Sequence, residues 1–231
     1  MTPFNWFGHI YCINAIPERR EAMKQRLQRM GFRTDPFSSG SEGHASFVSV
    51  KTPDPALKMS NMRRAAAPEF GINLGHVKAI VESVIRRVRR PLFIEDDVIF
   101  DESAEHRLRI AIEEMRSDYA KNKTDWSVLY LGGHPCEDVE RVGEHCVRTG
   151  RFSFAEAYCL NNPDGFLHFW FDRIGQPNAM FDRILGEYAK QYGGYCVYPV
   201  ITSQENLISS VAGQVDDKSH CIESGWKNHL K

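Results

Sequence analysis

The chain has 231 residues, 42% of them hydrophobic, and its 29 Lys and Arg residues nearly balance its 30 Asp and Glu residues. This composition excludes a disordered chain, a general nucleic-acid coat and a strongly cationic membrane peptide. The length favours one domain over residues 1–231, with a substantial core. No apolar run approaches the roughly 18 residues of a membrane span, and the start of the chain lacks the pattern of a secretory signal, so we expect a cytoplasmic protein.

Short apolar runs alternate with helical patterns along the chain, which predicts an α/β fold. The first predicted strand covers residues 9–13, and a helix follows that starts near Pro17 and ends at Gly31. Residues 33–70 are rich in turn residues and predict a flexible or functional loop, with one short strand near Val48.

The middle of the chain carries the clearest helical pattern, an apolar stripe over residues 74–88 that Pro91 ends. Residues 92–94 and 128–131 then read as buried strands, separated by a helix that Ser103 could cap. The later predicted elements are a hairpin over 136–153, a strand over 154–160, a helix over 163–170, a helix after Asn178, a strand over 195–200 and a polar C-terminal segment over 202–231.

Six cysteines are scattered along the sequence, and none of them forms a Cys-x-x-Cys pair. Cys12, Cys159 and Cys196 lie inside apolar runs. This usage predicts buried, reduced thiols rather than a disulfide framework or a zinc site.

The sharpest chemical feature is the run Glu95-Asp96-Asp97, which lies between two apolar segments. Three adjacent carboxylates repel one another unless a cation neutralises them. Ligands of α/β sheets bind at the carboxyl ends of the strands, and residues two apart on an extended segment face the same side, so Glu95 and Asp97 can converge. Such hard oxygen ligands suit Mg²⁺ or Mn²⁺ shared with substrate phosphates, whereas the alternative is an exposed acidic turn.

Seven segments of the chain follow one another in an order shared with a known family. Together they resemble glycosyltransferase family 25, the lipooligosaccharide and collagen sugar-transferase group, over most of the chain. The segments are Tyr11-Cys-Ile-Asn14 with Pro17-Glu-Arg-Arg20, Gly71-Ile-Asn-Leu-Gly-His76, Phe93-Ile-Glu-Asp-Asp-Val98, Asp125-Trp-Ser-Val-Leu-Tyr-Leu-Gly-Gly133, Ala157-Tyr158, Met180-Phe-Asp182, and Tyr198-Pro199 with Gln204.

The resemblance implies a GT-A type fold, a nucleotide-binding sandwich with a mostly parallel central sheet flanked by helices. It also implies a metal-dependent, inverting transfer of a hexose, galactose or glucose, from a nucleotide-sugar such as a UDP-hexose. The acceptor would be a hydroxyl on a glycan such as a lipopolysaccharide core. Mn²⁺ or Mg²⁺ would neutralise the charge that develops on the diphosphate leaving group.

Several residues receive donor-binding roles from this resemblance. Asn14 and Ala15 would lie beside the nucleoside, and Arg19 would pair with phosphate or organise the acidic site. His76 would touch the donor or position the acidic motif, with a helix-capping histidine as the alternative. Lys78 is a further candidate for diphosphate contact, and Glu95 and Asp96 belong to the same donor-binding set.

The metal and the general base are assigned in the same way. Asp97 and Glu95 would hold the metal, with His220 as a candidate late ligand and His229 as a weaker one. An inverting transfer needs a base to take the proton of the acceptor hydroxyl. Asp182 is the chosen base, because it matches the family's later Asp.

The sequence also allows other interpretations of the base, of the basic clusters and of the function. Glu156 and Asp164 are alternative bases, and Asp182 in a first helical turn with no chemical role is another possibility. Basic clusters at Arg19-Arg20, Arg63-Arg64 and 86–90 face either solvent or an anionic surface, a peripheral membrane or a nucleic-acid acceptor among them. Rival functions are transfer to a nucleic-acid base or a protein, a metal-dependent phosphotransferase or hydrolase, and an inactive binding module.

Overall fold

The computed structural model describes residues 3–14, 16–34, 43–50, 66–122, 125–149, 151–153, 156–173, 180–204 and 225–230. Its helices are η1 (Pro3–Trp6), α1 (Arg19–Arg29), α2 (Ala66–Ile85), α3 (Ala104–Asn122), α4 (Pro163–Phe171) and α5 (Phe181–Tyr192), with a short helix over 225–229. Its strands are β1 (His9–Asn14), β2 (Ala45–Ser49), β3 (Pro91–Glu95), β4 (Val98–Phe100), β5 (Val128–Tyr130), β6 (His134–Pro135), β7 (Glu140–Arg141), β8 (Cys146–Thr149), β9 (Phe152–Ser153), β10 (Ala157–Leu160), β11 (Gly194–Val197) and β12 (Thr202–Gln204).

The described part of the chain forms a central sheet of eight strands in the order β2-β1-β3-β10-β5-β11-β8-β7. β1, β2, β3, β5 and β11 point the same way, because β10 is antiparallel to both β3 and β5. β8 is also reversed, and β7 pairs with it as a hairpin. Two short sheets, β12-β4 and β6-β9, are attached to this frame.

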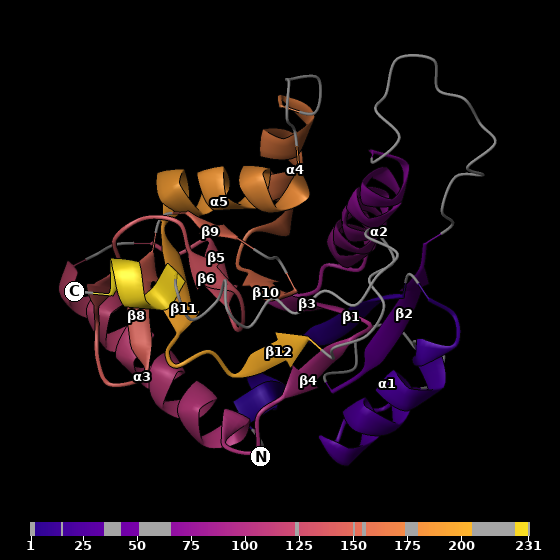
Figure 1. Ribbon diagram of the computed structural model, residues 1–231, viewed down its shortest axis with the longest axis horizontal. Helices are drawn as coiled ribbons and strands as arrows, with labels where there is room; N and C mark the ends of the chain where they lie inside the picture. The colour runs from indigo at the N-terminus through magenta and orange to yellow at the C-terminus, as the bar shows by residue number, and fades with distance from the viewer. Residues whose placement is uncertain are drawn as a thin grey trace.

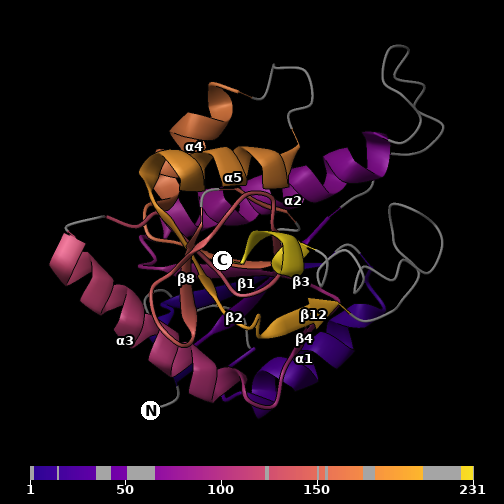
Figure 2. The same cartoon turned by 60° about the vertical axis from the view of Figure 1, so that its left-hand side comes forward.

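Helices cover both faces of the sheet, so the fold has three layers (Figure 1). α2, α4 and α5 lie on one face, and α1 and α3 lie on the other, as the rotated view also shows (Figure 2). Alternate residues of each strand therefore enter different cores. Tyr11 and Phe93 belong to the core under α2, α4 and α5, whereas Cys12 and Ile94 belong to the core over α1 and α3.

Gly75 allows α2 to approach the sheet closely. A Cβ atom at this position would lie 2.5 Å from Cγ2 of Val50 and 2.9 Å from Cγ2 of Ile13, closer than packed carbon atoms can come. The missing side chain thus sets the depth at which the helix packs beside the end of β1, and it holds the following residue, His76, against the sheet.

The structure confirms the mixed α/β architecture and most of the predicted elements, with differences at their ends. α2 begins at Ala66, so its first turn lies inside the segment 33–70 that predicted a loop, whereas β2 confirms the short strand predicted near Val48. The segment 202–231, predicted as a polar tail, opens with β12, because Thr202–Gln204 pair with β4. The predicted cap Asn178 lies outside the described residues, and Met180 occupies the N-cap of α5.

Among the described helices, none is long and apolar enough to cross a membrane. Cys12, Cys159 and Cys196 are buried as predicted, and burial raises the pKa of each thiol well above its usual range. Cys136, by contrast, is exposed.

Candidate active site

Asp96 is the organising residue of the acidic motif. Its side chain is 4% exposed, and Oδ2 accepts hydrogen bonds from Nδ2 of Asn14 at 2.8 Å and from the backbone N–H of Ile16 at 2.9 Å. Oδ1 lies 3.3 Å from an Arg19 nitrogen. A buried carboxylate needs such donors, because burial without them disfavours its charge. Asp96 therefore joins the end of β1 to the end of β3.

Asn14 is committed to the same junction. It is 3% exposed, and Nδ2 also donates to the carbonyl of Ile16 at 2.7 Å. Both hydrogens of the amide are thus used inside the protein. The structure gives Asn14 a positioning role next to the predicted nucleoside site, and Ala15, its predicted companion, lies outside the described residues.

Arg19 and Asp97 form the second part of the motif. The guanidinium of Arg19, on the first residue of α1, lies 3.2 Å from Oδ2 of Asp97 in addition to its contact with Asp96. The side chains of Arg19 and Asp97 are 13% and 18% exposed. Of the two roles considered for Arg19, the structure supports the organisation of the acidic site.

Glu95 has a different set of partners from Asp97. Its Oε2 accepts a 3.0 Å hydrogen bond from Nε2 of Gln204, and its Oε1 lies 3.5 Å from Nε2 of His76. Glu95 ends β3, whereas Asp96 and Asp97 form the turn into β4. The prediction that Glu95 and Asp97 converge assumed that both lie on one extended strand. Because β3 ends at Glu95 and Asp97 lies in the turn, the alternation of a strand does not apply to this pair. Glu95 and Asp97 instead contact different neighbours.

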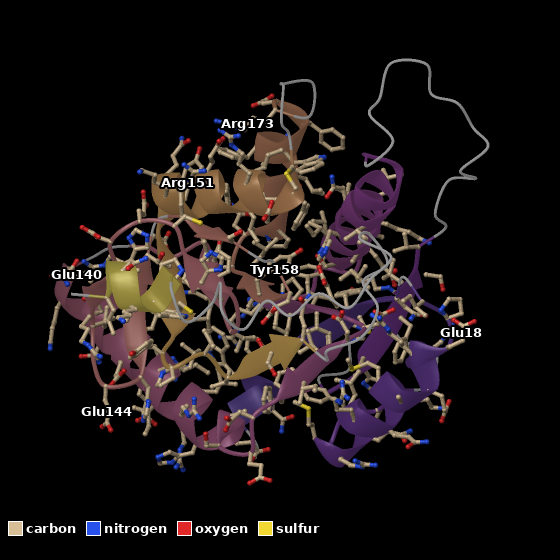
Figure 3. The ribbon with its side chains drawn as sticks, in the orientation of Figure 1. Glu18, Glu140, Glu144, Arg151, Tyr158 and Arg173 are labelled. Atoms are coloured by element: carbon tan, nitrogen blue, oxygen red, sulfur yellow. The ribbon has the colours of Figure 1, made fainter. Side chains whose placement is uncertain are left out.

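His76 is buried between the acidic motif and α5. Its side chain is 1% exposed, its Nδ1 lies 2.9 Å from the hydroxyl of Tyr158, and its ring stacks on Phe181 at a centroid distance of 4.4 Å. Tyr158 lies in the middle of the molecule (Figure 3). Of the three readings of His76, these contacts support positioning of Glu95.

Asp182 lies in the first turn of α5, next to Phe181, whose ring stacks on His76 near the end of β3. Oδ1 accepts from the backbone N–H of Arg183 at 2.7 Å, and Oδ2 accepts from the hydroxyl of Ser153, in β9, at 3.5 Å. Its charge also contributes, after burial and Cys196, to the raised pKa of Tyr130, the last residue of β5.

Glu156 is a buried carboxylate at the same edge. It is 1% exposed, its backbone carbonyl accepts a hydrogen bond from the N–H of Glu95, and its Oε1 accepts one from the Thr202 hydroxyl at 3.2 Å. A Cβ atom at Gly132 would lie 2.1 Å from Oε1, so the glycine makes room for this carboxylate. Of the two alternative bases, Glu156 therefore lies beside the acidic motif.

Three groups that the sequence proposed for the site lie away from the acidic motif. Because β10 runs against β3, α4 starts at the opposite edge of the sheet, and Asp164 with it. Lys78 is exposed and lies about 200° around α2 from His76. The basic cluster over 86–90 precedes β3, and the strand separates it from Glu95 by about 16 Å.

The predicted metal ligands include two late histidines, His220 and His229. His220 lies outside the described residues, and His229 pairs with Asp138 at 3.5 Å. Across the residues that the structure describes, no group of three or more His, Cys, Asp and Glu side chains is arranged to hold a metal ion. Within the described ranges, the motif therefore supplies no complete protein cage for a cation.

Gln204 was not predicted as a site residue. In the sequence it served only to mark the last of the segments that resemble the transferase family. It lies 109 positions from Glu95 and reaches it because β12 pairs with β4 in a register that sets Gln204 opposite Val98. Its place in that segment was the one sequence signal that pointed to Gln204.

The chain was compared with protein-family models and with curated proteins. No family model matches it, and no curated protein matches it significantly.

Proposed function

We propose that the protein is a metal-dependent glycosyltransferase that moves a hexose from a nucleotide-sugar to an acceptor hydroxyl, with inversion, on a GT-A type fold. The observation that carries the proposal is the clamp on Asp96 by Asn14, Ile16 and Arg19, which fixes Glu95 and Asp97 at the carboxyl edge of the sheet. This is the edge at which α/β sheets bind ligands. The resemblance of the ordered segments to glycosyltransferase family 25 supplies the reaction class.

The donor set fits a divalent cation that shares its coordination with phosphates. Glu95 and Asp97 offer hard carboxylate oxygens on side chains that are 25% and 18% exposed. Mg²⁺ sites that handle phosphates commonly use one or two carboxylates, with substrate oxygens and water completing the shell. When bound, the cation would neutralise charge on the diphosphate leaving group.

The residues of the chain divide the remaining tasks. Asp96 and Asn14 hold the two strand ends together, while His76 and Gln204 orient the two oxygens of Glu95. The oxygen of the acceptor hydroxyl attacks the anomeric carbon, and the bond from that carbon to the diphosphate breaks. Asp182 takes the proton of the hydroxyl during this attack. The glycan acceptor, a lipopolysaccharide core in our proposal, would approach from the side of α5.

A panel of UDP-, GDP- and CMP-sugars, each incubated with Mn²⁺, tests the proposal. We expect one donor to raise the melting temperature and to be hydrolysed slowly in the absence of acceptor. If no donor is bound or turned over, the transferase assignment fails. Release of inorganic phosphate without release of sugar would instead favour the phosphotransferase or hydrolase.

Two variants then separate metal binding from proton transfer. Asp97→Ala should abolish Mn²⁺-dependent donor binding, whereas Glu113→Gln, a charge removal on the exposed face of α3, should leave it unchanged. Asp182→Asn should retain donor binding and lose transfer by about 10²-fold or more. Full activity of Asp182→Asn would rule out Asp182 as the base and assign that role to Glu156, the other carboxylate at this edge.

A further inference from the structure

The turn between α2 and β3 is the most basic segment of the chain. It contains four arginines in five residues, over 86–90, and it directly follows Ile85, the last residue of α2. The turn lies where β3 begins, whereas the acidic motif lies where β3 ends. The basic turn and the candidate active site are therefore at opposite edges of the central sheet.

The backbone of this turn is held in one shape. Arg87 and Arg90 adopt left-handed conformations, with φ of 53° and 51°, which residues other than glycine rarely do. The N–H of Gly8, just before β1, donates to the carbonyls of Arg89 at 3.1 Å and of Arg90 at 3.3 Å. Val88 packs against the core under α2, α4 and α5. Arg87 and Arg89, on either side of Val88, are exposed, so the turn presents these two side chains to the outside.

The protein does not neutralise the charges of these two arginines. Glu82 forms an ion pair with Arg86 at 2.9 Å. Among the described residues, by contrast, no side chain pairs with the guanidinium of Arg87 or of Arg89. Neighbouring cations without partners create a positive potential at the surface and attract anions.

A further arginine extends this positive edge across β1 and β2. Arg33 is exposed, and its backbone N–H donates to the carbonyl of Gly43 at 2.9 Å, beside the start of β2. Its guanidinium also has no partner within the described part of the chain. Because β2, β1 and β3 are neighbours and begin at the same edge, arginines of this kind flank about 14 Å of it.

An exposed apolar side chain adjoins this positive surface. Ile85 is 75% exposed, more than any other large hydrophobic residue that the structure describes. The dipole of α2 favours arginines just past its C-terminus, but it does not explain an exposed isoleucine beside them. The phosphate backbone of a nucleic acid offers isoleucine no apolar partner, whereas a membrane offers anionic headgroups with acyl chains directly beneath them. The combination of side chains therefore favours a lipid surface over a nucleic acid.

We propose that the turn over 85–90 docks the protein on a membrane surface that contains anionic lipids. Arg33, Arg87 and Arg89 would contact the phosphates of the headgroups, and Ile85 would enter the boundary between headgroups and acyl chains. Each arginine near such a surface strengthens binding about fivefold, so the turn supplies a reversible attachment. The inference stands on this edge of the sheet and does not depend on sugar transfer at the acidic motif.

Flotation of the full chain with lipid vesicles tests the proposal. We expect binding to vesicles of phosphatidylcholine and phosphatidylglycerol in equal parts, much weaker binding to phosphatidylcholine alone, and release as the NaCl concentration rises. The double variant Arg87→Gln with Arg89→Gln should weaken binding to the anionic vesicles by about 25-fold. Arg109→Gln with Arg116→Gln is the matched control, because it removes two exposed arginines from α3 instead.

Ile85→Ser separates a lipid surface from other polyanions. It should weaken binding to the anionic vesicles by about tenfold and leave the melting temperature nearly unchanged, because the isoleucine is mostly exposed. Absence of binding to the anionic vesicles overturns the proposal, as does binding that survives either variant of the turn unchanged or that the α3 control weakens equally. Tighter binding to an RNA or DNA oligonucleotide than to the vesicles, lost in the arginine variant and kept in Ile85→Ser, would make the turn a nucleic-acid contact and overturn the proposal as well.

Discussion

The side-chain amide of Asn14 donates a 2.8 Å hydrogen bond to the buried carboxylate of Asp96, 82 positions further along the chain. This contact links the last residue of β1 to the turn that follows the neighbouring strand β3. The acidic motif thus owes its position to a polar contact between strand ends as well as to the sheet itself.

Asn14→Ala should lower the free energy of unfolding by about 1–3 kcal/mol, because Asp96 keeps its burial and loses a donor. Asn14→Asp should cost more, since it sets a second carboxylate against the first. Urea unfolding of both variants measures the effect. Equal stability of the wild-type protein and Asn14→Asp would show that Asp96 does not depend on this contact.

Gly75→Ala should destabilise the protein by about 1–3 kcal/mol, because the new methyl group would overlap side chains of β1 and of Val50. Gly186→Ala is the matched control within a helix. Its Cβ atom would meet its nearest neighbours at an ordinary 3.4 Å, and alanine favours a helix over glycine by about 1 kcal/mol. Thermal unfolding should therefore separate the two variants in opposite directions, and a neutral Gly75→Ala would contradict the close packing of α2.

In the proposed transferase, Gln204→Ala should weaken Mn²⁺-dependent donor binding by about 10–100-fold, the usual effect of removing a group that orients a metal ligand, because Glu95 would lose its contact with Gln204. Ser203→Ala, at the exposed neighbouring position of β12, should have little effect. Calorimetric titration of donor in the presence of Mn²⁺ compares the two variants. Equal affinities would remove Gln204 from the site without touching the assignment of Asp97.

His9 should make the fold sensitive to acid. Burial, with smaller contributions from His44 and Arg86, lowers its pKa from 6.5 to about 3. Above pH 6.5 the ring is neutral in the folded and unfolded chains, whereas between pH 6.5 and 3 only the unfolded chain takes up the proton. Stability should therefore fall with decreasing pH in this window, by up to about 1.4 kcal/mol per pH unit.

Urea unfolding at several pH values checks this dependence. His9→Gln, which keeps a polar group near the hydroxyl of Ser46, should flatten the pH profile, whereas His168→Gln on the exposed side of α4 should not. An unchanged profile for His9→Gln would assign the acid sensitivity to other groups.

The strands that carry the acidic motif were predictable because each is a run of apolar residues with a clear end. The same ends predicted that Asn14 and Glu95 lie at the carboxyl ends of strands, where ligands of α/β sheets bind. The organising role of Arg19 was one of two readings that the sequence left open, and only the contacts with Asp96 and Asp97 separate them.

The remaining site depends on pairings that apolar patterns do not encode. Nothing in the sequence of β10 says that it runs against β3, yet this reversal sets Glu156 beside Glu95 and carries Asp164 to the other edge. The strand β12 has only three residues and lies in a polar segment, so periodicity could not reveal it or the contact of Gln204 with Glu95. The first turn of α2 lies in a segment whose many turn residues predicted a loop, and its Pro68 is tolerated in a first helical turn.

The partners of the acidic motif also set the order in which the site is completed during synthesis. A chain made from its N-terminus can join Asn14 to Asp96 once β3 has left the ribosome, but Glu95 receives Gln204 only after a further 109 residues have been made. Glu95 can therefore contact His76 long before Gln204 is available to donate its hydrogen bond. A nascent chain that stalls before β12 carries the motif without its finished geometry, so donor binding should be among the last properties that the growing polypeptide acquires.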